Sequence, residues 1–594
     1  VETEVDAELL EAWRASSGDL DFQVTSWLRV GAPSGITATF DTCGVFPSTD
    51  KAADPREIVH YTDEFVNYSS VEDDPAAEQE IQKLIDSKYF TTYDSLDEAR
   101  QALGGEPVLS KIKMITKILS ITITKRRLIL DCLTSGANGQ TQQRERIILP
   151  KITDVVADVL TKLKQKADGE VVEQLVLDFS DAFFKVPNRP DERHWFVASF
   201  RGRFIVWRRI AQGSVNGPQA WGRLSALIGR LTASVFTEEE LDLQIYTDDP
   251  IATMKGTRQD VDKYMAFLVL LWRTLGFDLA FRKGQRGKAV SWVGHDLDIN
   301  EEDRSITVSI KKEFIEDLLA MTMDIAKQNK VGRRTLRSYT GKVSHVANLI
   351  WSMKPFMEQL WAACESKQGS SSSQGLVWKR QFADALSWVK SFLRQQQGPL
   401  TRQWRLDAYL ATAIKIMITF DACPTGLGGV LWINNVATEY FKSAVTEEDE
   451  ARFKFWRGDS TGQQICEALA LLVSLRLWRR FWTVDRTALI VQGDNVSALT
   501  MAMSMKAQSG SMKVIAREMA LEFSHSTLAP QVGEHIPGLT NTVADYLSRC
   551  FDPQRKQLPF PTALKSAVEV DPPPRDDTFF KVPFARDARR RGGR

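Results

Sequence analysis

Two adjacent carboxylates, Asp248 and Asp249, lie at the centre of a largely apolar stretch that runs from Leu243 to Ala252. This pattern predicts a β-hairpin with the acidic pair at its turn, where Asp is well tolerated. Side chains alternate between faces along a strand, so the two carboxylates cannot both enter one apolar core. At least one of them must meet water, a metal ion or a basic group. An Asp pair in a turn is by itself usually only a turn, so the rest of the chain decides its meaning.

A second acidic element lies upstream, where the apolar run from Leu175 to Leu177 ends in Asp178 and an aromatic pair follows. Two-metal nucleotidyl transfer uses cations about 3.5–4 Å apart, which requires carboxylates from separate strands to converge on one point. Asp178 together with the acidic pair would supply them. A lone Asp at a strand end is more often a cap. Capping does not explain why both elements occur with a Gly-containing loop between them.

With these motifs the chain resembles a reverse transcriptase. Tyr246–Asp249 is similar to the Tyr-X-Asp-Asp box of that family, Leu177–Phe183 to its first carboxylate motif, and Ala211–Pro218 to the Gln-Gly loop between them. The resemblance continues in the family's order from about residue 105 to residue 550. Asp131–Asn138 is more similar to DIRS-like retroelements than to retroviruses, and Asn541–Arg549 is similar to the tail motif of gypsy-like and DIRS-like elements.

The resemblance implies a multidomain α+β and α/β fold, in which a right-hand polymerase of fingers, palm and thumb is followed by a ribonuclease H-like domain. Asp178, Asp248 and Asp249 match the family's ligands for Mg²⁺ or Mn²⁺, and the carbonyl of Phe179 would be a further ligand. Phe183 matches the aromatic residue that excludes the 2′-hydroxyl of a ribonucleotide. Its ordinary alternative is a core aromatic residue after a strand.

Other positions match residues that contact the incoming nucleotide. Arg127 fits the Arg of the fingers strand, and Lys125 is a candidate for its Lys, because guanidinium and ammonium groups suit phosphate oxygens. The alternative is a solvated basic strand end. Gln212 and Gly213 would let the backbone approach the nucleotide closely, since Gly has no Cβ.

Lys283 matches the lysine that reaches the pyrophosphate side of the nucleotide as a possible general acid. Lys288 competes for that role, and either could be a solvated loop lysine. The chain departs from the family at Leu133, where an Arg is common. Two explanations are an altered fingers subdomain and a degenerate copy of the element.

Residues 411–550 contain a second set of carboxylates, at the ends of two apolar strands and on two helices: Asp421, Glu467, Asp494 and Asp545. Four carboxylates in such positions can build a two-metal hydrolytic site. They match the acidic quartet of ribonuclease H, and His535 matches its mobile histidine. Gly426–Gly429 is expected to turn the chain into the second strand. The alternative is a fold kept as an inactive connection, which would not require all four carboxylates.

Charge is distributed unevenly. Residues 1–100 hold 22 acidic and 7 basic side chains, and the remainder holds 54 acidic and 69 basic ones, so a basic footprint for phosphates is local. A basic run from Lys330 to Lys342 suits a helix on a duplex backbone.

We expect five segments: an acidic N-terminal extension (1–104), fingers and palm (105–300), a helical thumb or connection (301–400), a ribonuclease H-like domain (411–550) and a basic disordered tail (551–594).

Composition excludes several other classes. No apolar run approaches the ~20 residues of a membrane helix, and no secretory signal is visible. The six cysteines are scattered and form no Cys-X-X-Cys motif, which fits a reducing compartment, either cytoplasmic or nuclear.

The sequence therefore predicts an RNA-directed DNA polymerase joined to a ribonuclease H, from a retroelement. Its partners would be an RNA template, a DNA primer, an RNA–DNA hybrid and dNTPs, without a membrane. The main alternative is a decayed or domesticated, non-catalytic nucleic-acid-binding remnant. An RNA-dependent RNA polymerase is disfavoured by Phe183 and by the attached nuclease motifs.

Overall fold

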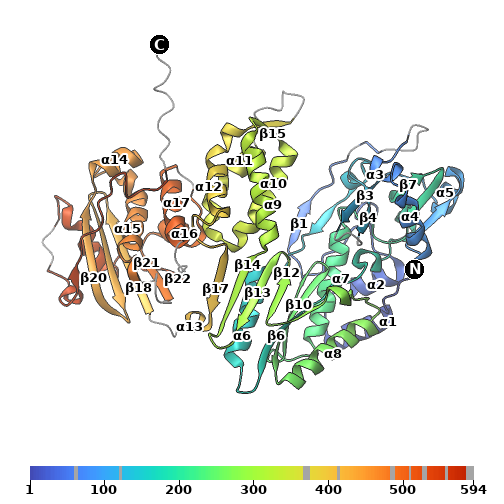
Figure 1. Cartoon of the computed structure of the whole chain (residues 1–594), viewed down its shortest axis with the longest axis horizontal. Helices are drawn as coiled ribbons and strands as arrows, with labels where there is room; N and C mark the ends of the chain where they lie inside the picture. The colour runs from blue at the N-terminus through green and yellow to red at the C-terminus, as the bar shows by residue number, and fades with distance from the viewer. Residues whose placement is uncertain are drawn as a thin grey trace, which may run out of the picture. The chain divides into compact units, whose positions relative to one another are not determined.

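The structure is a computed structural model that describes residues 1–55, 57–58, 65–118, 124–365, 375–410, 415–481, 488–507, 510–524, 532–555 and 559–582. The chain divides into two units, residues 1–293 and 294–594, and each combines helices with β-sheets (Figure 1). Within the described ranges, no helix has both the length and the apolar character that crossing a bilayer requires.

The acidic pair belongs to a four-stranded antiparallel sheet at the centre of the N-terminal unit. Tyr246 pairs with Asp249, so Thr247 and Asp248 form a two-residue turn, and the predicted hairpin is confirmed. Thr247 has φ +57°, the left-handed conformation that such turns use. The strands, in spatial order, are β11 (Gln285–Gly287), β6 (Val171–Val176), β10 (Asp249–Gly256) and β9 (Leu241–Tyr246).

Helices cover this sheet because their apolar faces match it. Trp221 of α7 (Gly217–Ala233) and Trp272 of α8 (Arg258–Thr274) are fully buried in one cluster with Leu175 and Leu177. Burial of each such aromatic side chain contributes about 1.5–3 kcal/mol. Further contacts with the sheet come from α6 (Ile152–Gln165) and β12 (Ala289–Trp292).

The sequence analysis predicted that residues 1–104 form a separate extension. In the structure they pack into the core of the N-terminal unit. Leu10 of α1 (Ala7–Ser17) and Trp27 of α2 (Phe22–Val30) belong to the same buried cluster as α7 and α8. Arg223 of α7 is fully buried and forms an ion pair with the buried Asp21. The acidic composition was therefore misleading, because part of the negative charge neutralises buried arginine instead of facing water. Apolar residues at helical spacing, among them the buried Ala77 and Ile81, form helix α4 (Ala76–Asp86).

The remaining strands of the N-terminal unit form small antiparallel sheets beside the central one. Strand β3 (Lys111–Ile118) pairs with β4 (Thr124–Asp131), the segment predicted to be the fingers strand. A second cluster of buried residues, including Phe90, Phe184 and Trp207, lies under these strands. The other elements are β1 (Ser48–Lys51), α3 (Ser69–Glu72), β2 (Phe90–Tyr93), α5 (Leu96–Leu103), β5 (Gln143–Glu145), β7 (Val197–Phe200) and β8 (Arg203–Trp207).

Residues 301–400 are largely helical, as predicted, and the C-terminal unit also contains antiparallel strands in this part. The Ser-, Gly- and Gln-rich segment 366–375, whose composition is typical of a linker, lies almost entirely outside the described residues. The elements are β13 (His295–Asn300), β14 (Ser305–Ile310), α9 (Lys312–Lys327), β15 (Lys330–Gly332), α10 (Arg333–Leu349), α11 (Glu358–Glu365), β16 (Leu376–Trp378), α12 (Ala383–Leu393), β17 (Thr401–Arg405) and α13 (Leu406–Tyr409).

A six-stranded mixed sheet follows. Its order is β22 (Val532–His535), β21 (Ala488–Gly493), β18 (Lys415–Cys423), β19 (Gly426–Ile433), β20 (Val436–Ala444) and β23 (Val568–Glu569). The first three strands are parallel, and β18, β19 and β20 are antiparallel. The long helix α15 (Gln463–Leu477), which carries Glu467, packs on β18 and β19 (Figure 1). The other helices are α14 (Glu447–Phe453), α16 (Val496–Ser504), α17 (Gly510–Ser524) and α18 (Thr542–Ser548).

The glycine-rich stretch 426–429 is part of strand β19, and the prediction of a turn there is wrong. Strand β18 ends at Cys423, so the turn consists of Pro424 and Thr425. A Cβ on Gly426 would lie 2.3 Å from the carbonyl oxygen of Ser548, because α18 lies directly on this strand. The glycines therefore permit close packing of a helix, not a change of direction.

The predicted disordered tail is also wrong for residues 559–582. Arg575 is buried and forms an ion pair with Asp449, and Phe579 and Phe580 are buried as well. These contacts are made with residues more than one hundred positions away, so a local composition rich in Pro and charge could not indicate them. Residues 583–594 lie outside the part that the structure describes.

Candidate active sites

The segment that carries Asp178 lies beside the turn that carries Asp248. The backbone N–H of Phe179 donates to the carbonyl of Asp248 at 3.0 Å, and the N–H of Leu177 donates to the carbonyl of Pro250 at 3.1 Å. The end of β6 is thereby joined to the hairpin turn by main-chain hydrogen bonds. The two acidic elements, about seventy positions apart in the sequence, occupy one end of one sheet.

Two buried indoles hold this turn in place. The Nε1–H of Trp221 donates to the carbonyl of Thr247 at 2.8 Å, and that of Trp292 donates to the carbonyl of Asp249 at 2.9 Å. With the bond from Phe179, three consecutive carbonyls of the turn accept hydrogen bonds. A site whose backbone is held by packing and hydrogen bonds is preorganised for binding.

Lys283 approaches the first of these carboxylates. Its Nζ lies 2.5 Å from Oδ2 of Asp178, and the lysine is about half exposed. In the described part of the chain, Asp178, Asp248 and Asp249 do not place three oxygens within 4.8 Å of one another. The segments meet as predicted, but the oxygens do not share one point. The Asp178 carboxylate is attracted to the ammonium of Lys283, whereas the three carboxylates repel one another.

The Gln-Gly loop is fixed against β4. The N–H of Leu130 donates to the carbonyl of Gln212 at 2.8 Å, and Gly213 has φ +123°. A Cβ at this position would lie 1.9 Å from the carbonyl oxygen of Leu130, so only Gly fits. The sequence argument had placed the close approach at the nucleotide, whereas the structure places it at the neighbouring strand.

The side chain of Asn138 forms hydrogen bonds with the Gln-Gly loop on both sides of Ser214. Asn138 donates from Nδ2 to the carbonyl of Gly213 at 2.9 Å and accepts from the N–H of Val215 at 2.9 Å. Both functions of one amide are therefore used on the two sides of Ser214. The sequence indicated Asn138 only as part of a motif and gave no sign of this contact, because the partners are more than seventy positions away.

Three other residues were predicted to contact the nucleotide: Arg127, Lys125 and Phe183. Arg127 is exposed on β4, three residues from Leu130, and the side chain of Lys125 lies outside the described residues. Phe183 is half-buried, and packs against the core cluster that contains Phe179. The partial exposure of Phe183 therefore agrees fully neither with a core residue nor with an exposed residue that contacts the sugar.

The C-terminal unit brings three carboxylates together. Asp421 of β18, Glu467 of α15 and Asp494, which follows β21, each offer an oxygen, and these oxygens all lie within 4.8 Å of one another. Strands β18 and β21 are neighbours and parallel, so their carboxyl ends lie at the same edge of the sheet. Helix α15 packs across β18 and supplies the third member.

Burial and mutual repulsion act on this group. Burial is the main cause that raises the pKa of Glu467 to about 9, and the nearby Asp421 and Asp494 raise it further. Burial also raises the pKa of Asp421 to about 7, against the hydrogen bond from Ser548, which lowers it. Without a cation, this site therefore holds protons that isolated carboxylates would release near pH 4.

The donor set fits a hard divalent cation. Oε1 of Glu467 accepts from Nε2 of Gln463 at 2.8 Å, and its buried Oε2 has no hydrogen-bond partner among the described residues. A buried, unsatisfied carboxylate oxygen is costly unless a cation or water meets it. Mg²⁺ and Mn²⁺ prefer oxygen ligands of this kind.

The other two predicted residues of this site lie at its edge. Asp545 is not a member of the close group, and its Oδ1 accepts from Nε of Arg549 at 2.6 Å. The predicted convergence is therefore observed for three of the four carboxylates. His535 is exposed, with Nε2 at 3.1 Å from the carbonyl oxygen of Asp494.

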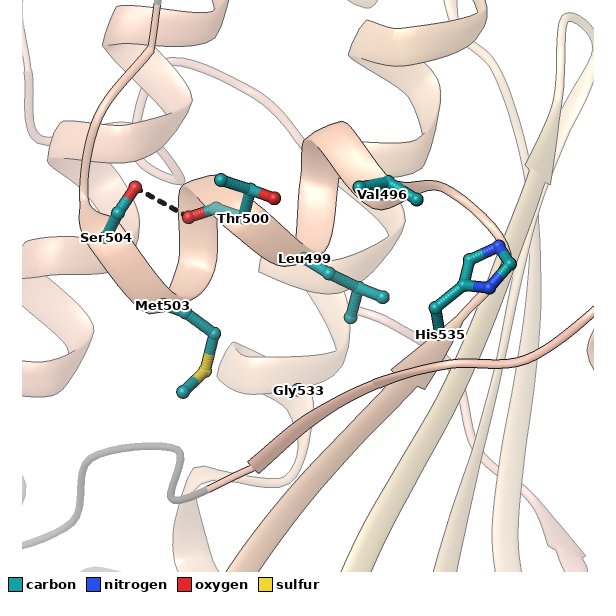
Figure 2. Close-up of a pocket in the computed structure, with 7 residues that line it drawn as sticks. All are labelled: Val496, Leu499, Thr500, Met503, Ser504, Gly533 and His535. Atoms are coloured by element: carbon teal, nitrogen blue, oxygen red, sulfur yellow. Dashed lines mark hydrogen bonds between the residues drawn. The ribbon is translucent and has the colours of Figure 1, made fainter.

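An apolar pocket of about 330 Å³ lies between α16 and β22. Figure 2 shows Leu499 and Met503 of the helix directed toward the strand that carries Gly533, with His535 at one end. His535 lines this pocket, and its Nε2 lies 3.1 Å from the carbonyl oxygen of Asp494. No sequence motif had indicated it, because its walls are ordinary apolar residues of an amphipathic helix.

No protein-family model matches the chain. Solved structures of a foamy viral protease-reverse transcriptase are similar to it at 13% sequence identity. One in complex with double-stranded DNA has a TM-score of 0.43 and covers 90% of this chain and 84% of that one. One in complex with an RNA/DNA hybrid has a TM-score of 0.40, with 93% and 66% covered. A further complex with double-stranded DNA has a TM-score of 0.40, with 91% and 98% covered.

Proposed function

We propose that the chain is an RNA-directed DNA polymerase with an associated ribonuclease H, from a gypsy-like or DIRS-like retroelement. The observation that carries the proposal is the presence of a separate acidic site in each unit. In the N-terminal unit, Asp178 lies beside the Asp248–Asp249 turn. In the C-terminal unit, the oxygens of Asp421, Glu467 and Asp494 converge. A single structural role does not account for both.

In the polymerase, the 3′-hydroxyl of the primer attacks the α-phosphate of a dNTP, and pyrophosphate leaves. Asp178, Asp248 and Asp249, with the carbonyl of Phe179, would hold Mg²⁺, which lowers the pKa of the attacking hydroxyl and neutralises the phosphates. Lys283, whose Nζ contacts the Asp178 carboxylate, would donate a proton to the leaving pyrophosphate.

The nucleotide would lie between the fingers strand and the Gln-Gly loop. Arg127 on β4 is exposed and supplies a guanidinium for the triphosphate, with Lys125 as the neighbouring cation. Gln212 and Gly213 are held against the same strand through Leu130. Phe183 follows Asp178 by five positions and would contact the sugar.

In the nuclease, water attacks a phosphodiester of the RNA strand, and the 3′-oxygen leaves. Asp421, Glu467 and Asp494 would hold the cations, and Asp545 lies close enough to raise the pKa of Asp421. The exposed His535, on the neighbouring strand, could carry a proton to or from the reacting groups.

Nucleic acid would be held mainly through its backbone. Lys330 on β15 and Arg334 at the start of α10 are exposed, and Arg337 on the next turn of the helix is paired with Glu365. Cations in such positions contact phosphates without reading sequence. The substrates on this proposal are an RNA template with a DNA primer, and the RNA–DNA hybrid that results.

The test measures both activities of the full chain in Mg²⁺, by primer extension on an RNA template and by degradation of RNA in a hybrid. Asp248→Asn should abolish extension and keep degradation, and Asp494→Asn should do the reverse. Absence of both activities in the folded wild-type chain would contradict the proposal. If one variant abolished both activities while remaining folded, the two-site assignment would be wrong.

A further inference from the structure

We propose that Ser548 is a positioning residue that orients the Asp421 carboxylate for cation binding. This inference rests on the proposed nuclease function and adds a residue to it. Ser548 lies at the end of α18, is completely buried, and donates a hydrogen bond from Oγ to Oδ2 of Asp421. Asp421 is itself 4% exposed. The contact therefore lies inside the protein, where geometry is fixed by packing.

The hydroxyl has one proton and two nearby acceptors. Its Oγ lies 3.0 Å from the carbonyl oxygen of Asp545, one turn earlier in the helix, and is closer to the Asp421 carboxylate. A carboxylate is the stronger acceptor, since hydrogen bonds to ionised groups are shorter and about twice as strong as neutral ones. The proton of Ser548 is therefore directed to Asp421.

Two features hold α18 close enough for this bond. Gly428 is the register partner of Asp421, and a Cβ on Gly428 would lie 2.7 Å from the backbone nitrogen of Ser548. Gly426 similarly approaches the carbonyl of Ser548. At the other end of the helix, the buried Asn541 donates from Nδ2 to the carbonyl of Phe420 at 3.0 Å. Helix α18 is thus anchored at both ends to the segment that carries Asp421.

The consequence concerns the direction in which Asp421 presents its oxygens. With Oδ2 held by Ser548, rotation of the carboxylate is restricted, and the group enters the site already oriented toward Glu467 and Asp494. Partners that orient metal-binding residues in this way typically change metal affinity by about 10- to 100-fold when they are removed. Ser548 would therefore act through Asp421 and not on the substrate.

The test uses the full chain carrying Asp248→Asn, so that binding at the other acidic site is weakened. Mg²⁺ alone is titrated by calorimetry, and hybrid degradation is measured as a function of Mg²⁺ concentration. Ser548→Ala removes the donor, and Ser548→Cys keeps the size with a weaker donor. Ser474→Ala is the matched control, because Ser474 is also completely buried but donates within its own helix to Ala470.

We expect Ser548→Ala to raise the half-saturating Mg²⁺ concentration at least about tenfold, Ser548→Cys by less, and Ser474→Ala not at all. Excess Mg²⁺ should restore hybrid degradation by Ser548→Ala. An unchanged Mg²⁺ midpoint in a folded Ser548 variant, or an equal shift in Ser474→Ala, overturns the inference and leaves the proposed function standing. Unfolding of both Ser548 variants would assign the residue a purely structural role. A wild-type chain that neither binds Mg²⁺ nor degrades a hybrid overturns the proposed function itself.

Discussion

The Nζ atom of Lys283 lies 2.5 Å from Oδ2 of Asp178, although the two residues are 105 positions apart. An ammonium at this distance competes with a cation for the carboxylate. Lys283→Gln should therefore strengthen Mg²⁺ binding to the N-terminal acidic site, measured by calorimetry in an Asp494→Asn background.

The same variant should slow primer extension by about 10²-fold if Lys283 protonates pyrophosphate. Lys288→Gln is the control, and it should change neither quantity. If Lys288→Gln alone slows extension, the general acid has been assigned to the wrong lysine.

Phe183 should determine the choice between dNTP and rNTP. The ring is half-buried and five positions after Asp178, so a smaller side chain would make room for a 2′-hydroxyl. Phe183→Val is expected to raise the rate of rNTP incorporation relative to dNTP in single-nucleotide extension. The neighbouring Phe184 is buried and stacks on Tyr89 with ring centroids 4.6 Å apart, so Phe184→Leu should lower stability without changing selectivity. Unchanged selectivity in active Phe183→Val would make Phe183 a core residue.

Asn138 should control nucleotide affinity through the Gln-Gly loop. Asn138→Ala removes both hydrogen bonds to the loop, which frees Gly213 and Val215, so the KM for dNTP should rise about 10-fold, with a smaller change in kcat. Asn67 makes a comparable set of bonds to Ile112, Glu72 and Ser199 elsewhere in the unit. Asn67→Ala should therefore reduce thermal stability without a selective effect on KM. Equal effects on KM from both variants would argue against a local role for Asn138.

Stability of the metal-free C-terminal unit should fall as pH rises. The pKa of Glu467 is raised in the folded chain to about 9, so the folded state binds more protons than the unfolded state. This contribution to stability is fully present below about pH 4.5 and is lost as pH rises through about 9. Thermal unfolding without metal should show this slope between pH 5 and pH 9, and Glu467→Gln should flatten it. Mg²⁺ should stabilise the wild-type chain more at pH 8 than at pH 6, because ligands must be deprotonated. A flat profile for the wild type would contradict this.

Arg575 should anchor the C-terminal segment. Its guanidinium donates to both oxygens of the buried Asp449 and also to Ser443 and Ala444. Removing one partner of a buried ion pair costs about 3–5 kcal/mol, so Arg575→Ala should lower the free energy of unfolding of the C-terminal unit by about that amount. Asp577, which is 97% exposed and paired with Arg452, provides the control. Asp577→Ala should cost less than about 1 kcal/mol in the same denaturant titration. A cost for Arg575→Ala as small as that expected for Asp577→Ala would show that Arg575 does not anchor the segment.

What the sequence determined was local. Alternating apolar residues around Asp248 were enough to predict the hairpin, because strand periodicity and turn preference depend on neighbouring residues. The same reasoning located Asp421 and Asp494 at strand ends and Glu467 on a helix. It failed at Gly426–Gly429. Glycine is typical of turns, but these glycines lie in a strand and make room for helix α18, which is distant in the sequence.

Only the tertiary structure decided which side chains meet. The pairing of Lys283 with Asp178, the bracket of Asn138 on Gly213 and the contact of Ser548 with Asp421 each join residues 75 to 127 positions apart. The N-terminal helices and residues 559–582 likewise joined cores that their own composition did not indicate. Such contacts depend on how helices pack on sheets and on which buried charges need partners, and neither is encoded in a short window of sequence.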